Sequence, residues 1–342
     1  MKYVGVDLHK QSITLCVMVK DGEQRKIEQR CTLICADTPA IRKFFEQLGA
    51  PFRLVVEATS SYEWFLLLVE DLADRCVLAH PKKLRVIAGS KQKSDKIDAR
   101  ILAEFLLLDM IPEAHRPTPR IREYRVLVRH RNRIQRQITS VKCKLRHKAA
   151  FYNADIARLF TARGLDHLAR IAMSHADQFE CQALREQLLF LQEQLKAAEK
   201  ELALFAQSAP VAEQESRAVL ATMPTVGTVT VDVVLSEAAD VRRFRSAKKI
   251  VAYAGLDPGF RESAGKGKEL HITKEGSRLL RWALIETAWR LVRTSPRWRQ
   301  LFIKLRGSTG HIKKAIVGVA RRVLCVMYAM LRDGKAYRLA AD

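Results

Sequence analysis

Apolar and polar residues alternate over the first third of the chain with the period of short strands. Residues 3–7, 12–19 and 26–33 are rich in branched and apolar side chains, which favour the pleated, half-buried surface of a sheet. Asp21-Gly22 lies between the second and third of these segments, and this dipeptide is typical of a tight hairpin turn. We therefore expect three consecutive antiparallel strands.

Helical and strand-like segments alternate after this point. Asp37-Thr38-Pro39 combines a capping residue with a proline in the first turn, which predicts a helix to about residue 48. Residues 52–57 and 76–79 are apolar runs of strand length, and residues 62–73 and 97–108 have helical patterns. The resulting order, βββαβαβα, predicts an α/β domain with a mixed sheet and helices on its faces.

From residue 121 onward the apolar spacing becomes helical. Residues 127–145 carry one narrow apolar seam flanked by arginines, and residues 184–205 repeat leucines at alternating spacings of 4 and 3. The second pattern predicts an α-helical coiled coil. The two seams are compatible with pairing inside one chain or with a second chain in a dimer.

The remainder of the chain is predicted to be mostly α-helical. Residues 220–227 resemble a helix-hairpin-helix turn, although Thr225 stands where the usual hairpin has glycine; a plain helix–helix turn fits equally well. Prolines and the segment Ser208-Ala209-Pro210 mark the expected domain boundaries and divide the chain into three expected domains. They are residues 1–120, a basic-helix and coiled-coil region at 121–210, and a C-terminal domain at 211–342.

Charge is distributed very unevenly along the chain. The 60 basic and 37 acidic residues give a net charge of +23, of which residues 116–148 hold +11 and residues 242–342 hold +17, whereas residues 149–241 hold −6. A polyanion with closely spaced phosphates makes the best use of such basic blocks, because each neutralised phosphate releases counterions. This favours a nucleic acid as partner over a merely solubilising basic surface or an acidic-lipid surface.

Composition excludes several other classes of protein. The chain is 48% hydrophobic, too much for a largely disordered protein, and its apolar runs are shorter than the roughly 18–20 residues that a membrane helix requires. Its seven cysteines are an odd set without a Cys-x-x-Cys pair, so we expect them to be reduced. The first residues carry no signal-peptide pattern, and a cytoplasmic location is expected.

Four carboxylates stand at positions that a metal site would use. Asp7 and Glu57 each end a predicted strand, while Asp95 and Asp98 lie three residues apart at a helix start, where they share one face. Convergent carboxylate oxygens suit Mg²⁺, which can assist displacement at a phosphodiester. Each acid alone also has a structural explanation, as a cap, an ion-pair partner or a first-turn acid.

A second group of residues lies in the basic C-terminal part. Ser263 falls in a predicted loop close to Lys266 and Lys268, which would favour a bound phosphate. A loop serine becomes a nucleophile only where a base or a metal is in reach, so its chemistry alone leaves this assignment open.

Together these motifs resemble one family. They are the Asp7, Glu57, Asp95 and Asp98 quartet, Val-Glu-Ala-Thr at 56–59, Lys-Ser-Asp-Lys-Ile-Asp-Ala-Arg at 93–100, Ala-Gly-Leu-Asp-Pro at 254–258 with Ser263, and the helix start at 274–281. The chain resembles DEDD-type insertion-sequence transposases, the bridge-RNA-guided recombinases related to pilin-gene invertases. The resemblance extends over nearly the whole chain and implies a ribonuclease-H-like fold, similar to Holliday-junction resolvases, for residues 1–120.

The resemblance also implies a mechanism. The quartet would hold Mg²⁺ at the scissile phosphate, and Ser263 would attack to give a covalent phosphoserine link and a free 3′ hydroxyl. Partners would be the element's DNA ends, target DNA, an element-encoded guide RNA and further copies of the chain, as a dimer assembling to a tetramer. Relatives commonly have glycine directly after the serine, whereas Ala264 precedes Gly265 here; Ser277 is the alternative nucleophile.

Basic residues of the two charged segments are the expected contacts to nucleic acid, since an arginine-rich helix suits the phosphates and 2′-hydroxyls of an RNA duplex. Two other functions fit the same residues: a metal-dependent hydrolytic junction-resolving nuclease, in which water attacks and Ser263 only contacts phosphate, and a noncatalytic architectural protein that binds DNA or RNA. The expected nucleic-acid contacts are Arg100, Arg122, Arg125, Arg129, Arg131, Arg133, Arg136, Lys142, Lys144, Arg261, Lys266, Lys268, Lys274, Arg278 and Arg281.

Overall fold

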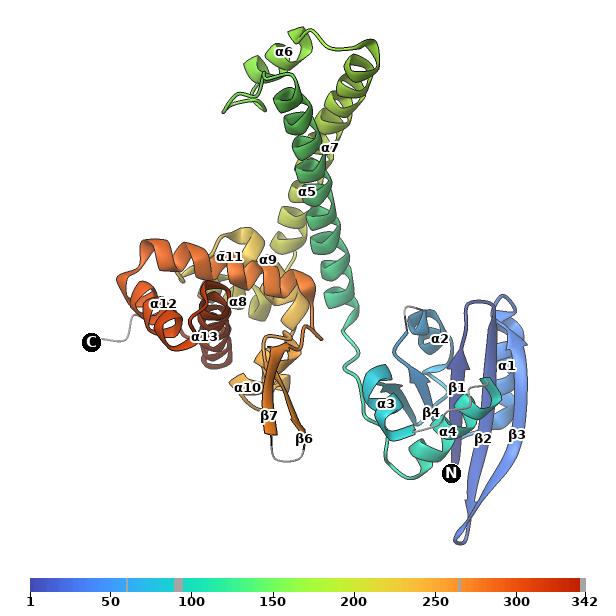
Figure 1. The fold of residues 1–342 in the computed structure, drawn as a ribbon. Helices are drawn as coiled ribbons and strands as arrows, with labels where there is room; N and C mark the ends of the chain where they lie inside the picture. Colours follow the sequence, from blue (N-terminus) through green and yellow to red (C-terminus); the bar gives the residue numbers. More distant parts are fainter. Residues whose placement is uncertain (60, 89–94, 264–265, 339–342) are drawn as a thin grey trace. The chain divides into compact units, whose positions relative to one another are not determined.

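The computed structural model describes residues 1–59, 61–88, 95–263 and 266–338 (Figure 1); side chains of residues 86–97 and 260–270 lie outside this description. The chain divides into two compact units, Met1–Arg116 and Pro117–Asp342. Each unit has its own hydrophobic core.

The first unit is built on a five-stranded sheet. Its strands are β1 (Lys2–Leu8), β2 (Ser12–Asp21), β3 (Gln24–Ile34), β4 (Phe52–Glu57) and β5 (Arg75–Ala79), in the order β3-β2-β1-β4-β5. The pairs β1–β2 and β2–β3 are antiparallel, whereas β1–β4 and β4–β5 are parallel. The predicted mixed sheet is therefore confirmed.

Helices cover both faces of this sheet (Figure 1). On one face, α1 (Thr38–Leu48) and α2 (Tyr62–Val69) bury Phe45 and Phe65 against Val4 and Val6. On the other face, α4 (Asp95–Leu107) packs over β1 and β2. Central strands covered on both sides have continuous apolar sequences, which explains the run of buried residues in β4.

Several helix boundaries differ from the sequence-based expectation. The helix α3 (Pro81–Ala88) was not predicted, because its eight residues are strongly basic and too few to show a clear apolar period. The helix α2 ends at Val69 rather than at residue 73. The helix α4 begins at Asp95 rather than at 97, which places Asp95 and Asp98 in its first turn.

The second unit begins with a long helical pair. The helices α5 (Pro119–Phe151) and α7 (His175–Gln207) are connected through the short α6 (Ala162–Arg170). Arg131 near the start of α5 pairs with Glu199 near the end of α7, and Lys148 near the end of α5 pairs with Asp177 near the start of α7, so the two helices are antiparallel. The two predicted seams pair within one chain, through Ile134, Ile138, Val141, Leu145, Leu184, Leu188, Leu191, Leu195 and Ala198.

The remaining elements form a helical core around α9. They are α8 (Val211–Ala221), α9 (Thr228–Ala238), the short 3-10 turn η1 (Val241–Arg243), α10 (Ala247–Tyr253), α11 (Arg278–Thr294), α12 (Pro296–Thr309) and α13 (Ile312–Asp333). The first turns of α5 also belong to this core, since Tyr124 and Val128 are buried in it. Between α10 and α11 the chain forms a hairpin of β6 (Pro258–Ser263) and β7 (Lys266–Ile272), where the sequence predicted a loop.

The turn between α8 and α9 is the predicted hairpin position. Thr225 has a φ of 65°, in the left-handed region that glycine tolerates and a β-branched residue does not. Its Oγ1 is buried and has no hydrogen-bond partner among the residues that the structure describes. The backbone thus retains a conformation suited to glycine although the sequence has threonine.

Across the described parts of the chain, every helix is too short or too polar to span a bilayer.

Candidate active site

Asp7 and Glu57 lie side by side at one edge of the sheet. The parallel strands β1 and β4 are in register through Val6 and Val56, so the next residue of each strand is a carboxylate. The strand β4 ends at Glu57, and β1 ends one residue after Asp7, at Leu8. Val6 and Val56 are fully buried, whereas Asp7 and Glu57 are half-buried. The predicted convergence of these two acids therefore agrees with the strand register.

The helix α4 brings Asp98 to the same end of the sheet. Ala99 and Ala103 pack on Gly5, and Leu107, at the far end of α4, packs in the same cluster as Met18 of β2. Met18 pairs with Tyr3 and Thr14 pairs with Asp7, so α4 runs antiparallel to β1. Its first turn, which contains Asp98, lies toward the carboxyl end of β1.

This approach of α4 depends on a glycine. An ideal Cβ on Gly5 would lie 2.0 Å from the carbonyl oxygen of Ala99 and 2.4 Å from the backbone nitrogen of Ala103. No side chain fits at such distances, so the helix backbone rests directly on the strand. Gly5 therefore fixes the height of α4, and with it of Asp98, above β1.

Asp7 has a histidine neighbour. Its Oδ2 lies 3.0 Å from Nε2 of His9, and the Asp7 side chain is 14% exposed while His9 is 47% exposed. Thr14, the cross-strand partner of Asp7, is buried and its Oγ1 lies 3.2 Å from Oγ1 of Thr32. The carboxylate of Asp7 is thus held at the rim of the sheet, where solvent and a ligand can reach it.

The donor set of this edge suits a hard divalent cation. Asp7, Glu57 and Asp98 supply carboxylate oxygens from two strand ends and one helix start, the ligand type that Mg²⁺ prefers. The side chain of Asp95, the fourth predicted ligand, lies outside the described residues. Asp7, Glu57 and Asp98 are among the described side chains, and there they do not come together as a group of three that could hold a metal ion. The complete quartet therefore stays a prediction.

Ser263 is the last residue of β6 and pairs with Lys266 at the start of β7. Its side chain, like those of Arg261, Lys266 and Lys268, is outside the described residues, and Ala264 and Gly265 lie wholly outside them. Side-chain hydrogen bonds join the two ends of the hairpin at its base. Arg281 donates from Nη1 to the carbonyl oxygens of Ala254 and Gly276, at 3.1 and 2.7 Å, and so joins the chain entering the hairpin to the chain leaving it.

Ser277, the alternative nucleophile, has a structural function. It is the N-cap of α11, and its Oγ accepts a hydrogen bond from the backbone N–H of Leu280 at 3.2 Å. A capping hydroxyl satisfies one of the free N–H groups of the first helical turn. This supports the interpretation of Ser277 as a helix-start residue.

The arginines predicted to contact nucleic acid fall into two groups. Several are engaged within the chain: Arg125 donates to the carbonyl oxygens of Ser236 and Glu237, Arg131 pairs with Glu199, and Arg122 donates to the carbonyl oxygen of Pro117. Arg129 and Arg281 are likewise held by intrachain contacts, and Lys142 lies over the ring of Phe160. The exposed members are Arg100, Arg133, Arg136, Lys144, Lys274 and Arg278.

Two buried acids that sequence analysis did not single out organise the start of α5. Asp232 accepts from the hydroxyl of Tyr124 at 2.7 Å and pairs with Arg217 at 2.7 Å, and Glu237 pairs with Arg129. Burial and the adjacent Asp232 carboxylate raise the pKa of Tyr124, so its hydroxyl stays a donor. The sequence signal that could have pointed to Asp232 and Glu237 is the presence of acidic residues inside the mostly apolar helix α9.

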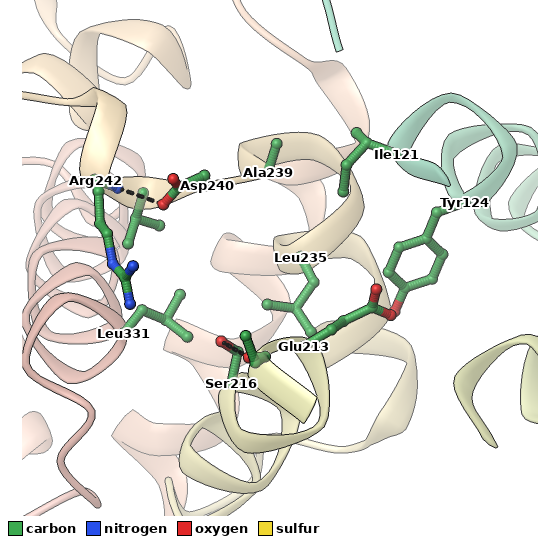
Figure 2. Close-up of a pocket in the computed structure, with 11 residues that line it drawn as sticks. Ile121, Tyr124, Glu213, Ser216, Leu235, Ala239, Asp240, Arg242 and Leu331 are labelled. Carbon is green, nitrogen blue, oxygen red and sulfur yellow. Dashed lines mark hydrogen bonds between the residues drawn. The ribbon is translucent and has the colours of Figure 1, made fainter. Parts of the chain in front are cut away.

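A cavity of about 250 Å³ lies beside this network, between the start of α5, α8, η1 and α13. Figure 2 shows Glu213 and Ser216 on one side and Arg242 and Leu331 on another. Glu213 is already paired with Arg120 at 2.6 Å, and Asp240 accepts from the backbone N–H of Arg242. None of the predicted quartet residues lines it, so it is separate from the carboxylate edge.

Comparison with known proteins identifies both parts of the chain. Residues 4–153 match a family model described as a transposase of the DEDD IS110 type, and residues 217–302 match the Transposase IS116/IS110/IS902 family. These two regions of the chain are therefore similar to IS110/IS116-family transposase domains. The first match contains Asp7, Glu57, Asp95 and Asp98, and the second contains Ser263 and Ser277, so the two matched regions include every predicted catalytic residue.

Individual relatives agree with these matches. The chain is 25% identical to the transposase for insertion sequence element IS1111A of Coxiella burnetii, over 100% of this chain and 92% of the relative. It is 23% identical to the pilin gene-inverting protein of Moraxella bovis, over 98% and 97%. It is 29% identical to an uncharacterized IS110 protein of Streptomyces coelicolor, but that match spans 45% of this chain and only 37% of the relative.

Proposed function

We propose that this protein is a transposase or site-specific recombinase that cuts and rejoins DNA. One observation carries the proposal: the register of β1 with β4 and the direction of α4 bring Asp7, Glu57 and Asp98 to one end of a sheet inside a region that matches a DEDD transposase model. The relatives named transposase and pilin gene-inverting protein cover nearly the whole chain, which supports an activity on DNA.

The proposed chemistry uses residues of both units. The sheet of residues 1–120 is ribonuclease-H-like, and its quartet of Asp7, Glu57, Asp95 and Asp98 would hold Mg²⁺. When bound, the cation would lower the cost of the negative charge that develops at the scissile phosphate. Ser263 Oγ attacks the phosphorus, an O–P bond forms, and the bond from phosphorus to the 3′ oxygen breaks.

This step yields a phosphoserine link to the 5′ side of the break and a free 3′ hydroxyl. In the reverse direction, a 3′ hydroxyl of another strand attacks the phosphoserine and releases the serine. The number of phosphodiester-type bonds is unchanged throughout, so strands can be exchanged without ATP. Hydrolysis would lose this bond, which is why a covalent intermediate suits recombination.

Guidance by an element-encoded RNA and assembly into a dimer or tetramer belong to the same proposal. Arg133, Arg136 and Lys144 are exposed on α5, outside the apolar seam that packs on α7, where they suit the closely spaced phosphates of a nucleic-acid duplex. In a tetramer, the carboxylates of one copy would meet the Ser263 hairpin of another. Target sequence would then come from base pairing.

The test is a denaturing gel of purified protein with Mg²⁺, the RNA transcribed from the element's flank and end-labelled DNA. Wild type should give a protein-linked DNA band, which Ser263→Ala and Asp7→Asn should abolish. Ser277→Ala is the matched control: it removes a helix cap and should retain the band. Omitting the RNA should also remove the band if the protein is guided.

Other results would change the assignment. Loss of the band in Ser277→Ala but not in Ser263→Ala would move the nucleophile to Ser277. Cleavage without any linked band, equal in wild type and Ser263→Ala, would replace the proposal with a hydrolytic junction-resolving nuclease. Binding of DNA or RNA with neither cleavage nor linkage would leave a noncatalytic architectural protein.

A further inference from the structure

The last three helices carry most of the positive charge of the second unit. Residues 278–338 contain fifteen lysines and arginines but only two acids, Glu286 and Asp333. Asp333 is paired with Arg332 at 2.7 Å. A basic field of this density attracts phosphates, but charge alone does not locate a binding site.

A cavity of about 230 Å³ lies between α12, α13 and the segment that follows α13. Three elements each contribute one arginine to it: Arg297 from α12, Arg322 from α13 and Arg338 from the final segment. Among the described residues that line the cavity, none is acidic. The other lining residues are Trp298, Leu301, Val326 and Tyr337.

Hydrogen bonds hold the residues around this cavity in place. The Nε1 of Trp298 donates to the hydroxyl oxygen of Tyr337 at 3.0 Å, and Trp298 is only 5% exposed. The backbone N–H of Tyr337 donates to Oγ1 of Thr222 at 2.8 Å, and that of Lys335 donates to the carbonyl oxygen of Met330 at 3.1 Å. The segment after α13 is thereby fixed on the core, and Arg338 follows directly.

Arg322 and Arg338 bring two guanidinium groups to one small cavity, where they repel each other unless an anion lies between them. Guanidinium forks match the oxygens of a phosphate in a bidentate way, and a tyrosine hydroxyl that accepts one hydrogen bond can donate another. Whole drug-sized ligands occupy cavities of roughly 300–1,000 Å³. The smaller cavity here therefore suits a single phosphate group better than a complete nucleotide.

We propose that this cavity binds one backbone phosphate of a nucleic acid. The identity of the polyanion rests on the proposed function, whereas the site itself is separate from the predicted reaction centre. Consecutive residues of α13 connect the two regions: Arg322 lines the cavity, and Arg321 pairs with Asp257, at the start of the Ser263 hairpin, at 3.6 Å. A phosphate held by Arg322 would thus position nucleic acid relative to that hairpin.

The test measures binding rather than cleavage, so that it remains informative if the reaction centre is wrong. Fluorescence anisotropy with a fluorescein-labelled DNA duplex, and separately with an RNA duplex of the same sequence, gives the affinity as a function of salt. Arg322→Gln and Arg338→Gln are the cavity variants. Arg306→Gln is the matched control, because Arg306 is exposed on α12 and does not line the cavity.

Loss of one phosphate contact should reduce the slope of log K against log salt by about 0.9 on B-DNA. We expect this reduction, with a several-fold loss of affinity at low salt, in both cavity variants and not in Arg306→Gln. A change with only the DNA or only the RNA probe would identify which nucleic acid supplies the phosphate. Equal slopes in Arg322→Gln, Arg306→Gln and wild type, at equal melting temperature, would overturn the proposal.

Discussion

Arg129 of α5 binds the carboxylate of Glu237 in α9 through two parallel hydrogen bonds, from Nε at 2.8 Å and from Nη2 at 2.9 Å. The Glu237 side chain is 2% exposed, whereas that of Arg129 is 54% exposed. An arginine of the basic helix α5 therefore neutralises a buried acid of the C-terminal core.

This pair predicts that substitutions of two nearby arginines of α5 will differ in their effect on folding stability. Arg129→Ala leaves a buried carboxylate without its partner and should destabilise the second unit by about 2 kcal/mol, below the 3–5 kcal/mol of a fully buried pair because Arg129 is half exposed. Arg133→Ala removes an exposed charge and should leave stability unchanged while weakening nucleic-acid binding. Thermal unfolding and anisotropy on both variants check this; equal stability of the two would contradict it.

The contact of Gly5 with α4 predicts a severe effect of a single methyl group. Gly5→Ala places a Cβ against the backbone of Ala99 and Ala103, and the helix must move away, so we expect a loss of at least about 2 kcal/mol. Gly227→Ala is the control, since a Cβ there meets nothing within 4 Å. Urea unfolding should separate the two variants, and a wild-type midpoint for Gly5→Ala would show that α4 does not rest on β1.

Thr225 offers a stabilising substitution. Thr225→Gly removes the backbone strain of a β-branched residue in the left-handed region. This gain should exceed the entropy that glycine adds to the unfolded chain, so we expect the free energy of unfolding to rise by about 1 kcal/mol. For a unit of this size the melting temperature should rise by roughly 2–4 °C. Differential scanning calorimetry checks the shift. A lower melting temperature would mean that the threonine methyl group contributes more packing than its backbone conformation costs.

Asp177 gives a prediction for acid pH. A hydrogen bond from Lys148, with others from Tyr152 and Ser174, lowers the pKa of Asp177 to about 2. Because this pKa lies below the unfolded value of about 3.9, the stabilisation is complete above pH 4 or so and is lost as the pH falls toward 2. The difference in melting temperature between wild type and Asp177→Asn should therefore shrink across this window. A constant difference would contradict the assignment.

Sequence analysis predicted the sheet well because its signals are local. The apolar runs around Val6 and Val56, the Asp21-Gly22 turn and the Asp37 cap each depend on a few neighbouring residues. The same locality gave the positions of Asp7 and Glu57, since each directly follows the buried valine of its strand, Val6 or Val56. The short helix α3 was not predicted because its eight residues, three of them basic, carry little periodic signal.

Sequence analysis could not predict which arginines are engaged within the chain and which are exposed, because these contacts join residues far apart in the sequence. Arg131 and Glu199 are 68 residues apart, and Arg129 and Glu237 are 108 apart. Nothing in the local pattern around Arg129 distinguishes it from the exposed Arg133, because only tertiary packing determines which side chain meets an acid. For the same reason the arginines of the C-terminal cavity, drawn from three elements, share no recognisable sequence spacing.

The helix α5 has a mechanical consequence. Its first turns are locked into the core by Tyr124, Arg125 and Arg129, and its later turns are paired with α7. A continuous helix of 33 residues is about 50 Å long. Because of this length, a tilt of a few degrees where α5 meets the C-terminal core would displace the α6 end of the helix by several ångströms.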